Sequence, residues 1–118
     1  MDHARKERLT AGGIQVEDAV ARLMGNEMLL ERFLQKFAAD TRYYDALCAA
    51  DEAGDMKAML EASHALKGLC GNLSMRTLFD LFSRQVEALR AGKWESAAAL
   101  MPEIRAAYAK AVDAIGEG

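Results

Sequence analysis

Two histidines are the residues of this chain best suited to nucleophilic chemistry, and only one has an informative context. His3 lies in a charged segment, whereas His64 lies in the run SHALKGLCGNLS over 63–74. A neutral imidazole is a competent nucleophile at pH 7, since the ordinary histidine pKa is about 6.5. Lys67 follows by about one helical turn, and an ammonium group attracts and neutralises phosphoryl oxygens. The pair suits a histidine that receives and holds a phosphoryl group.

Two glycines are predicted to share a helix face with this histidine. On a helical wheel His64 lies roughly 100–130° from the middle of the apolar side, and Gly68 and Gly71 lie within about 40° of it. A glycine inside a helix costs about 1 kcal/mol relative to alanine. We therefore interpret the two glycines as a bare patch on which a partner protein docks. The alternative is an ordinary surface histidine beside glycines that loosen the helix end.

The composition predicts an all-α fold. The 118 residues include only ten β-branched residues (four Val, three Ile, three Thr), and Ala, Leu, Met, Glu, Lys and Arg are abundant. Fifteen basic and eighteen acidic residues give a net charge of −3, which argues against nucleic-acid binding. The short apolar runs argue against a membrane span. Without a recognisable export signal, Cys48 and Cys70 are expected to be reduced and to point into the core of a cytoplasmic protein.

Apolar periodicity and glycine positions predict one short helix and four long ones. The expected ranges are 16–24, 26–53, 56–73, 75–91 and 94–115. Asn26, Asp55 and Ser74 are the expected N-caps, and Pro102 should kink the last helix or delay its start. Short connections make successive long helices antiparallel neighbours. The prediction is an up-down-up-down antiparallel four-helix bundle with a short N-terminal capping helix. It places a flexible arm over 1–13 and a single domain over 14–118.

Around His64 the sequence resembles the histidine-containing phosphotransfer (HPt) domains of two-component phosphorelays. Their motif is His-x-Leu-Lys-Gly followed by small residues and often Asn-Leu-Gly, and this chain has HALKGLCGNLS over 64–74. The resemblance implies that His64 is the phosphoacceptor, that Lys67 is its charged neighbour, and that Gly68 and Gly71 give clearance for docking. Ser74 stands where many members have glycine. Leu69-Cys70 replaces a pair that is often smaller, which could alter partner fit.

Two further predictions come from the expected bundle geometry. Gln85 interrupts an apolar stripe at the expected level of His64, so its amide is predicted to hydrogen-bond near the imidazole or the phosphoryl group; a surface glutamine is the alternative. Phe33 and Phe37 could form a docking patch, but aromatic residues at helical spacing are usually core, and we interpret them so.

The resemblance implies a phosphoryl carrier that takes the group from a receiver-domain aspartyl phosphate and passes it to another receiver. Receiver domains and a hybrid histidine kinase are the expected partners, the chain is expected to be monomeric, and Mg²⁺ is expected on the receiver rather than here. No Gly-rich phosphate loop occurs, which argues against a kinase. A single Glu-x-x-His run is present, from Glu61 to His64, whereas a carboxylate-bridged dimetal site takes one such run from each of two helices, so a metal bundle is not favoured. A non-catalytic helical adaptor that binds a receiver or kinase is the alternative. A metal or haem bundle is a weaker one.

Overall fold

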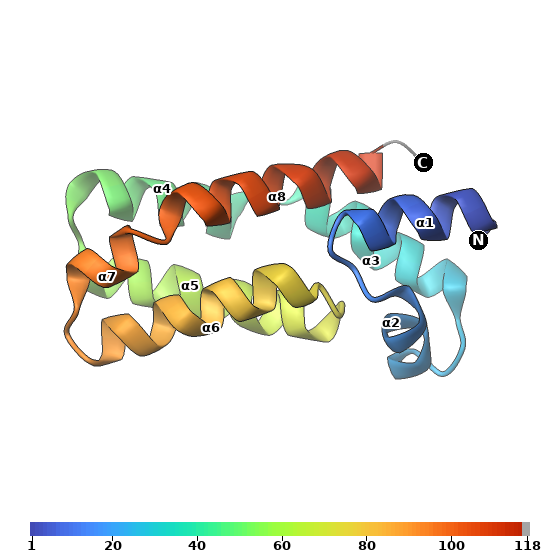
Figure 1. Cartoon of the computed structure of the whole chain (residues 1–118), viewed down its shortest axis with the longest axis horizontal. Helices are drawn as coiled ribbons and strands as arrows, with labels where there is room; N and C mark the ends of the chain where they lie inside the picture. Colours follow the sequence, from blue (N-terminus) through green and yellow to red (C-terminus); the bar gives the residue numbers. More distant parts are fainter. Residues whose placement is uncertain (117–118) are drawn as a thin grey trace.

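The computed structural model of the chain describes residues 1–116 and is helical throughout this range, apart from short connections (Figure 1). Residues 117–118, the end of the predicted domain, lie outside the described residues. The all-α prediction is confirmed. The helices are α1 (His3–Ala11), α2 (Val16–Arg22), α3 (Glu27–Ala39), α4 (Arg42–Ala53), α5 (Met56–Asn72), α6 (Arg76–Arg90), α7 (Trp94–Ala98) and α8 (Met101–Gly116).

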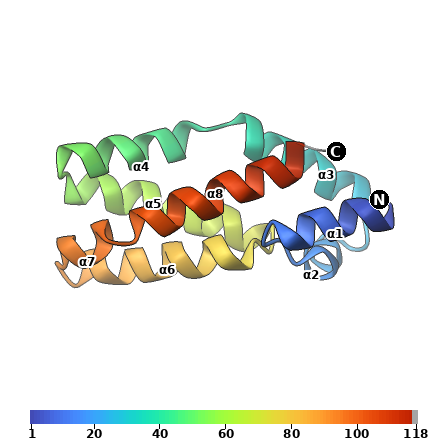
Figure 2. The same ribbon diagram turned by 45° about the horizontal axis from the view of Figure 1, so that its top comes forward.

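Four helices, α4, α5, α6 and α8, lie along the long axis of the molecule and run in alternating directions (Figures 1 and 2). The most extensive helix–helix contact joins α5 to α6, and the next joins α4 to α5. The helix α8 contacts α6 as well as α1 and α3. The helices α1–α3 and the C-terminal end of α8 lie at the same end of the molecule (Figure 1). The turn between α5 and α6 faces this end, so the last residue of the motif, Ser74, lies beside α2.

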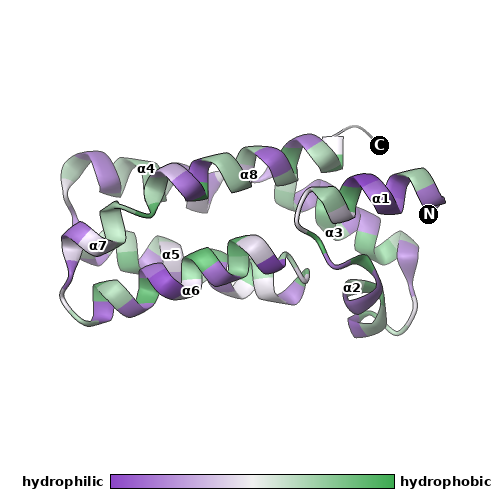
Figure 3. Cartoon of the chain, in the orientation of Figure 1, coloured by the Kyte–Doolittle hydropathy of each residue, from purple (hydrophilic) through white to green (hydrophobic). Residues whose placement is uncertain are grey.

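Apolar side chains from every long helix fill one continuous core. Apolar and polar residues are interspersed along each helix, as expected for helices with one buried and one solvated face (Figure 3). A chain of this length can form a stable core of this kind without a metal ion or a disulfide. Its largest fully buried side chains are Phe82, Leu9, Ile14, Leu30, Leu34, Leu47, Met59, Met75, Leu78, Met101, Ile104 and Ile115.

The predicted flexible arm is wrong, because residues 3–11 form α1. Asp2 caps this helix by accepting a hydrogen bond from the Arg5 backbone N–H at 2.7 Å. The Arg5 side chain, only 4 % exposed, donates to both carboxylate oxygens of Glu31 and to the Ala114 carbonyl. Leu9 is fully buried on the same helix. One buried leucine and one buried arginine anchor a segment whose composition alone indicates a solvated arm.

The predicted helix over 26–53 is interrupted at 40–41, which separates α3 from α4. Asp40 has an extended backbone (ψ 98°), and its carboxylate accepts hydrogen bonds from the Arg42 backbone N–H and guanidinium. Such local side-chain-to-backbone bonds compete with helix propagation. Phe37 is buried as predicted, whereas Phe33 is 41 % exposed, so its assignment to the core is wrong.

The predicted last helix is also two elements. The short helix α7 is followed by α8, which begins at Met101, so Pro102 occupies the first turn of α8. A proline is tolerated there because the first N–H groups of a helix have no partner within it. The sequence predicts that Pro102 either kinks the last helix or delays its start, and the structure has the delayed start.

Candidate functional site

The motif lies on α5, which begins with a well-formed cap. Gly54 has a left-handed backbone (φ 66°), and the Asp55 side chain accepts a hydrogen bond from the Ala58 N–H at 3.0 Å. The predicted Asp55 cap is confirmed, and a left-handed glycine is a common end for the preceding helix. The buried face of α5 carries Met59, Ala62, Ser63, Leu66 and Cys70.

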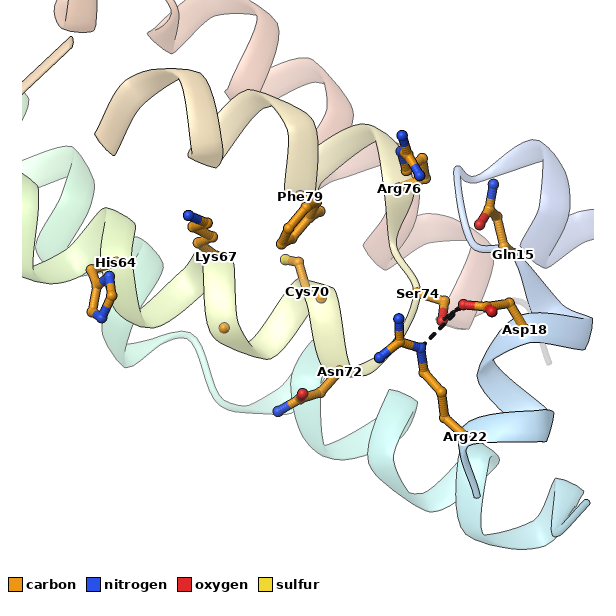
Figure 4. A pocket seen from close by; sticks show the side chains of 12 residues that line it. Gln15, Asp18, Arg22, His64, Lys67, Cys70, Asn72, Ser74, Arg76 and Phe79 are labelled. Carbon is orange, nitrogen blue, oxygen red and sulfur yellow. Dashed lines mark hydrogen bonds and ion pairs between the residues drawn. The ribbon is translucent and has the colours of Figure 1, made fainter. Parts of the chain in front are cut away.

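His64 is exposed and lies on the rim of a groove of about 410 Å³ (Figure 4). Lys67, Gly68 and Gly71 from the same helix also line this groove, so the structure brings the predicted motif residues together. The opposite wall comes from α6 and from α2. Its residues include Phe79 and Arg76 on α6, and Gln15, Asp18 and Arg22 at the α2 end.

The two motif glycines have different surroundings. A methyl group added at Gly68 would have no neighbour within 4 Å, so this position is bare surface, as predicted. A methyl group added at Gly71 would lie 3.0 Å from two ring carbons of Phe79. Gly71 therefore admits an aromatic ring of the same chain, and the simple interpretation as docking clearance fits Gly68 alone.

Lys67 is half-buried, and its side chain extends over α5 towards α6 (Figure 4). Its Nζ lies 6.0 Å from the centroid of the Phe79 ring, within range of a cation–π interaction. The sequence contains no signal that Phe79 belongs to this site. Phe79 and Lys67 are on different helices, and they come close only because α6 packs on α5.

The turn at the end of the motif, after α5, is joined to α2 by side chains. The Ser74 hydroxyl donates to Asp18 Oδ2 at 2.5 Å, and Arg22 Nε donates to the same oxygen at 3.1 Å (Figure 4). The Gln15 backbone N–H also donates to the Ser74 carbonyl at 2.9 Å. Together these contacts hold α2 at one end of the groove.

The prediction that Ser74 caps α6 is wrong. The residue at the N-cap position is Met75, and Ser74 has a left-handed backbone with φ 54°. This conformation costs a non-glycine residue on the order of 1 kcal/mol, which explains why a glycine suits this position in the resembling motif. The hydrogen bond to Asp18 offsets part of that cost.

The Asp18 contacts predict a pH-dependent contribution to stability. The Ser74 hydroxyl and then Arg22 lower the pKa of the Asp18 carboxyl from its ordinary 3.8. A lowered folded-state pKa stabilises the fold above the unfolded-state pKa, and this stabilisation is lost as pH falls through the folded-state pKa. Asp18→Asn should therefore be less stable than wild type at pH 7, with the difference shrinking below about pH 3.8.

Chemical denaturation of both proteins between pH 7 and pH 2 measures this difference. Glu17→Gln removes a neighbouring exposed carboxylate on the same helix and serves as the control. An Asp18→Asn difference that stays constant with pH would contradict the role assigned to the charged carboxylate.

The predicted contact between Gln85 and the imidazole or phosphoryl group is wrong. Gln85 is fully buried, accepts a hydrogen bond from the Ser63 hydroxyl, and donates from Nε2 to the Ala97 carbonyl at 3.0 Å. Its level along the bundle is close to that expected, since Ser63 adjoins His64. The side chain faces inward, however, because the polar α7 backbone requires a partner there. The position of Gln85 within an apolar stripe of α6 is the sequence signal that indicates burial.

Both cysteines are free, and they differ in burial. Cys70 is fully buried beneath the groove, and burial raises the pKa of its thiol to about 12. Cys48 is only half-buried, so its predicted place in the core is correct only in part.

In the folded protein, iodoacetamide at pH 8 should therefore modify Cys48 and leave Cys70 intact, since the thiolate is the reactive form. Peptide mass mapping before and after unfolding in denaturant measures this selectivity. Equal labelling of the two thiols in the folded state would contradict the burial of Cys70.

Comparison with known proteins decides the family. The model of the Hpt domain family matches residues 26–114, which is more than half of the chain. The chain belongs to the Hpt domain family. The matched residues include all of α3 to α6, and therefore the whole motif on α5. Comparison with curated proteins and with solved structures found no match.

Membership of this family confirms the resemblance found in the sequence. Hpt domains carry phosphoryl groups by histidine phosphotransfer in two-component phosphorelays, are not kinases, and interact with receiver domains and histidine kinases. None of the helices of this Hpt domain, over the part of the chain that the structure describes, is long and apolar enough to cross a membrane. Within residues 1–116, no group of three or more His, Cys, Asp or Glu side chains is arranged to hold a metal ion.

Proposed function

We propose that His64 of this Hpt domain accepts a phosphoryl group from a receiver-domain aspartyl phosphate and passes it to a second receiver domain. The observation that supports this most directly is the exposure of His64 at the rim of a groove that also contains Lys67 and the bare Gly68. The bundle of α4, α5, α6 and α8 is the proposed scaffold that keeps this face of α5 open to partners.

The proposed step is an in-line displacement at phosphorus. A ring nitrogen of neutral His64 forms the new N–P bond while the bond from phosphorus to the aspartyl oxygen breaks. The bonding electrons leave with the aspartate, which becomes a free carboxylate. The reverse reaction, on the aspartate of a second receiver, regenerates the imidazole. Mg²⁺ on the receiver domain and the Lys67 ammonium would balance the charge of the transferring oxygens.

The bare surface at Gly68 has a direct part in this proposal. The aspartyl phosphate lies in the active site of a folded receiver, so its rim must approach the backbone of α5. A side chain at position 68 would stand between the two proteins, whereas glycine leaves this approach open. We further propose that the protein acts as a cytoplasmic monomer and that a hybrid histidine kinase supplies the phosphoryl group to the relay.

Phosphotransfer profiling tests the proposal. Each receiver domain of the source organism is phosphorylated with a labelled phosphoryl group and mixed with the wild-type chain, and the label on each protein is followed over time. A carrier takes label from at least one receiver and returns it to another. Tight binding to a receiver without any transfer of label would instead support the helical adaptor.

A further inference from the structure

We infer that Phe79 is a positioning residue for phosphoryl transfer, because its ring restrains the Lys67 ammonium in the groove shared with His64. This inference rests on the proposed function. Phe79 on α6 and Lys67 on α5 both line the groove, and Lys67 Nζ lies 6.0 Å from the ring centroid (Figure 4). The negative face of an aromatic ring attracts a cation at this range.

The packing around the ring shows why it occupies this place. Gly71 lies under Phe79, and a methyl group at position 71 would lie 3.0 Å from both Cδ1 and Cε1 of the ring. The absence of a side chain at Gly71 thus allows the ring to lie directly against α5. The ring lies at the contact between α5 and α6, which is the most extensive helix–helix contact among the described residues, so its position is well held.

The surroundings of Lys67 leave its charge available. Within residues 1–116, Lys67 forms no ion pair, and its contact with the Phe79 ring is the interaction that the structure assigns to its ammonium. An acidic partner would neutralise the cation and hold it away from an anion, whereas an aromatic ring restrains it and leaves its three N–H donors free. Restraint before binding reduces the rotamer entropy lost when the phosphoryl group arrives.

The first test measures Lys67 in the free protein. NMR relaxation of the Lys67 side chain reports its order in wild type, Phe79→Leu and Phe79→Tyr. Order should fall in Phe79→Leu and be retained in Phe79→Tyr, which keeps the ring. Gly71→Ala forces the ring to shift by a few tenths of an ångström and should lower the order less than Phe79→Leu does, whereas the matched Gly68→Ala should leave it unchanged. Unchanged Lys67 order in Phe79→Leu would overturn the inference.

The second test is a double-mutant cycle on phosphoryl transfer. Phe79→Leu should slow transfer roughly two- to fivefold, the range of an exposed cation–π contact. In the Lys67→Ala background the same substitution should have no further effect, because the group that the ring restrains is absent. Equal slowing in both backgrounds would show that Phe79 acts without Lys67 and would overturn the inference.

The two tests separate this inference from the proposal on which it rests. If the wild-type chain accepts no phosphoryl group from any receiver, the carrier proposal fails, and the transfer role of Phe79 fails with it. The relaxation measurement then still decides whether the ring restrains Lys67. If wild type transfers normally and Phe79→Leu changes neither the rate nor the order, the carrier proposal stands and the inference about Phe79 is wrong.

Discussion

His64→Gln should reduce phosphoryl uptake from a phosphorylated receiver to background, a loss of at least about a thousandfold. Glutamine has a similar length and can form hydrogen bonds, but its amide nitrogen is not a nucleophile. Because His64 is exposed and outside the core, the variant should fold and unfold like wild type. Receiver binding should persist, since the imidazole is a small part of the proposed docking face. Label transfer and binding are measured on the same preparations.

The chain provides a matched control for this experiment. His3 is the second histidine, and it is exposed on α1, where it contacts Glu7 at 2.8 Å. His3→Gln makes the same chemical change outside the groove and should leave uptake unchanged. Label that persists in His64→Gln and disappears in His3→Gln would place the acceptor on α1 and contradict the assignment of His64.

Gly68→Gln should slow transfer roughly ten- to a hundredfold while the fold is retained, because small displacements of reacting groups carry penalties of this size. A Cβ atom added at position 68 has no neighbour within 4 Å, so a longer side chain there would project from open surface into the space that a receiver is proposed to enter. Replacing a helical glycine should also stabilise the protein by roughly 0.5–1 kcal/mol. Slower transfer together with greater resistance to denaturant distinguishes obstruction from damage to the fold.

Two control variants test whether obstruction at position 68 is the cause. Gly68→Ala adds only a methyl group, so it should stabilise the helix and slow transfer less than Gly68→Gln. Ala109→Gln places the same glutamine on an exposed position of α8, which does not line the groove, and should transfer normally. A Gly68→Gln protein with wild-type transfer rates would show that partners do not approach over this position.

The parts of the site encoded locally could be predicted from the sequence. Helical periodicity, the Gly54 stop and the Asp55 cap define α5, and the helical wheel then separates exposed His64 from buried Leu66. Since neighbours along one helix have a fixed angular spacing, the shared surface of His64, Lys67 and Gly68 follows without knowledge of the remaining fold.

The parts that depend on contacts between distant segments could not be predicted in the same way. Gln85 lies at the expected level but points inward, because its partners Ser63 and Ala97 come from two other elements. Gly71 and Gly68 fall on the same face of the helical wheel. They differ only in that the Phe79 ring, on α6, packs against Gly71. Short-range sequence patterns carry no information on such pairings.

The N-terminal segment is a further example. Its composition is that of a solvated arm, and only two of its helical residues, Arg5 and Leu9, are buried. The decisive contacts of Arg5 reach Glu31 on α3 and the Ala114 carbonyl on α8. A buried arginine is stable only when its charge and its donors are satisfied, so the helix depends on partners far along the chain.

The position of the phosphoryl group is the most direct measurement of the central claim. After reaction with a phosphorylated receiver, the wild-type chain is digested under alkaline conditions, which preserve phosphohistidine, and the modified residue is located by tandem mass spectrometry. The account predicts one phosphorylated site, on a ring nitrogen of His64, which is lost on brief acid treatment. A phosphoryl group on any other residue, or none on a chain that binds the phosphorylated receiver, would contradict it.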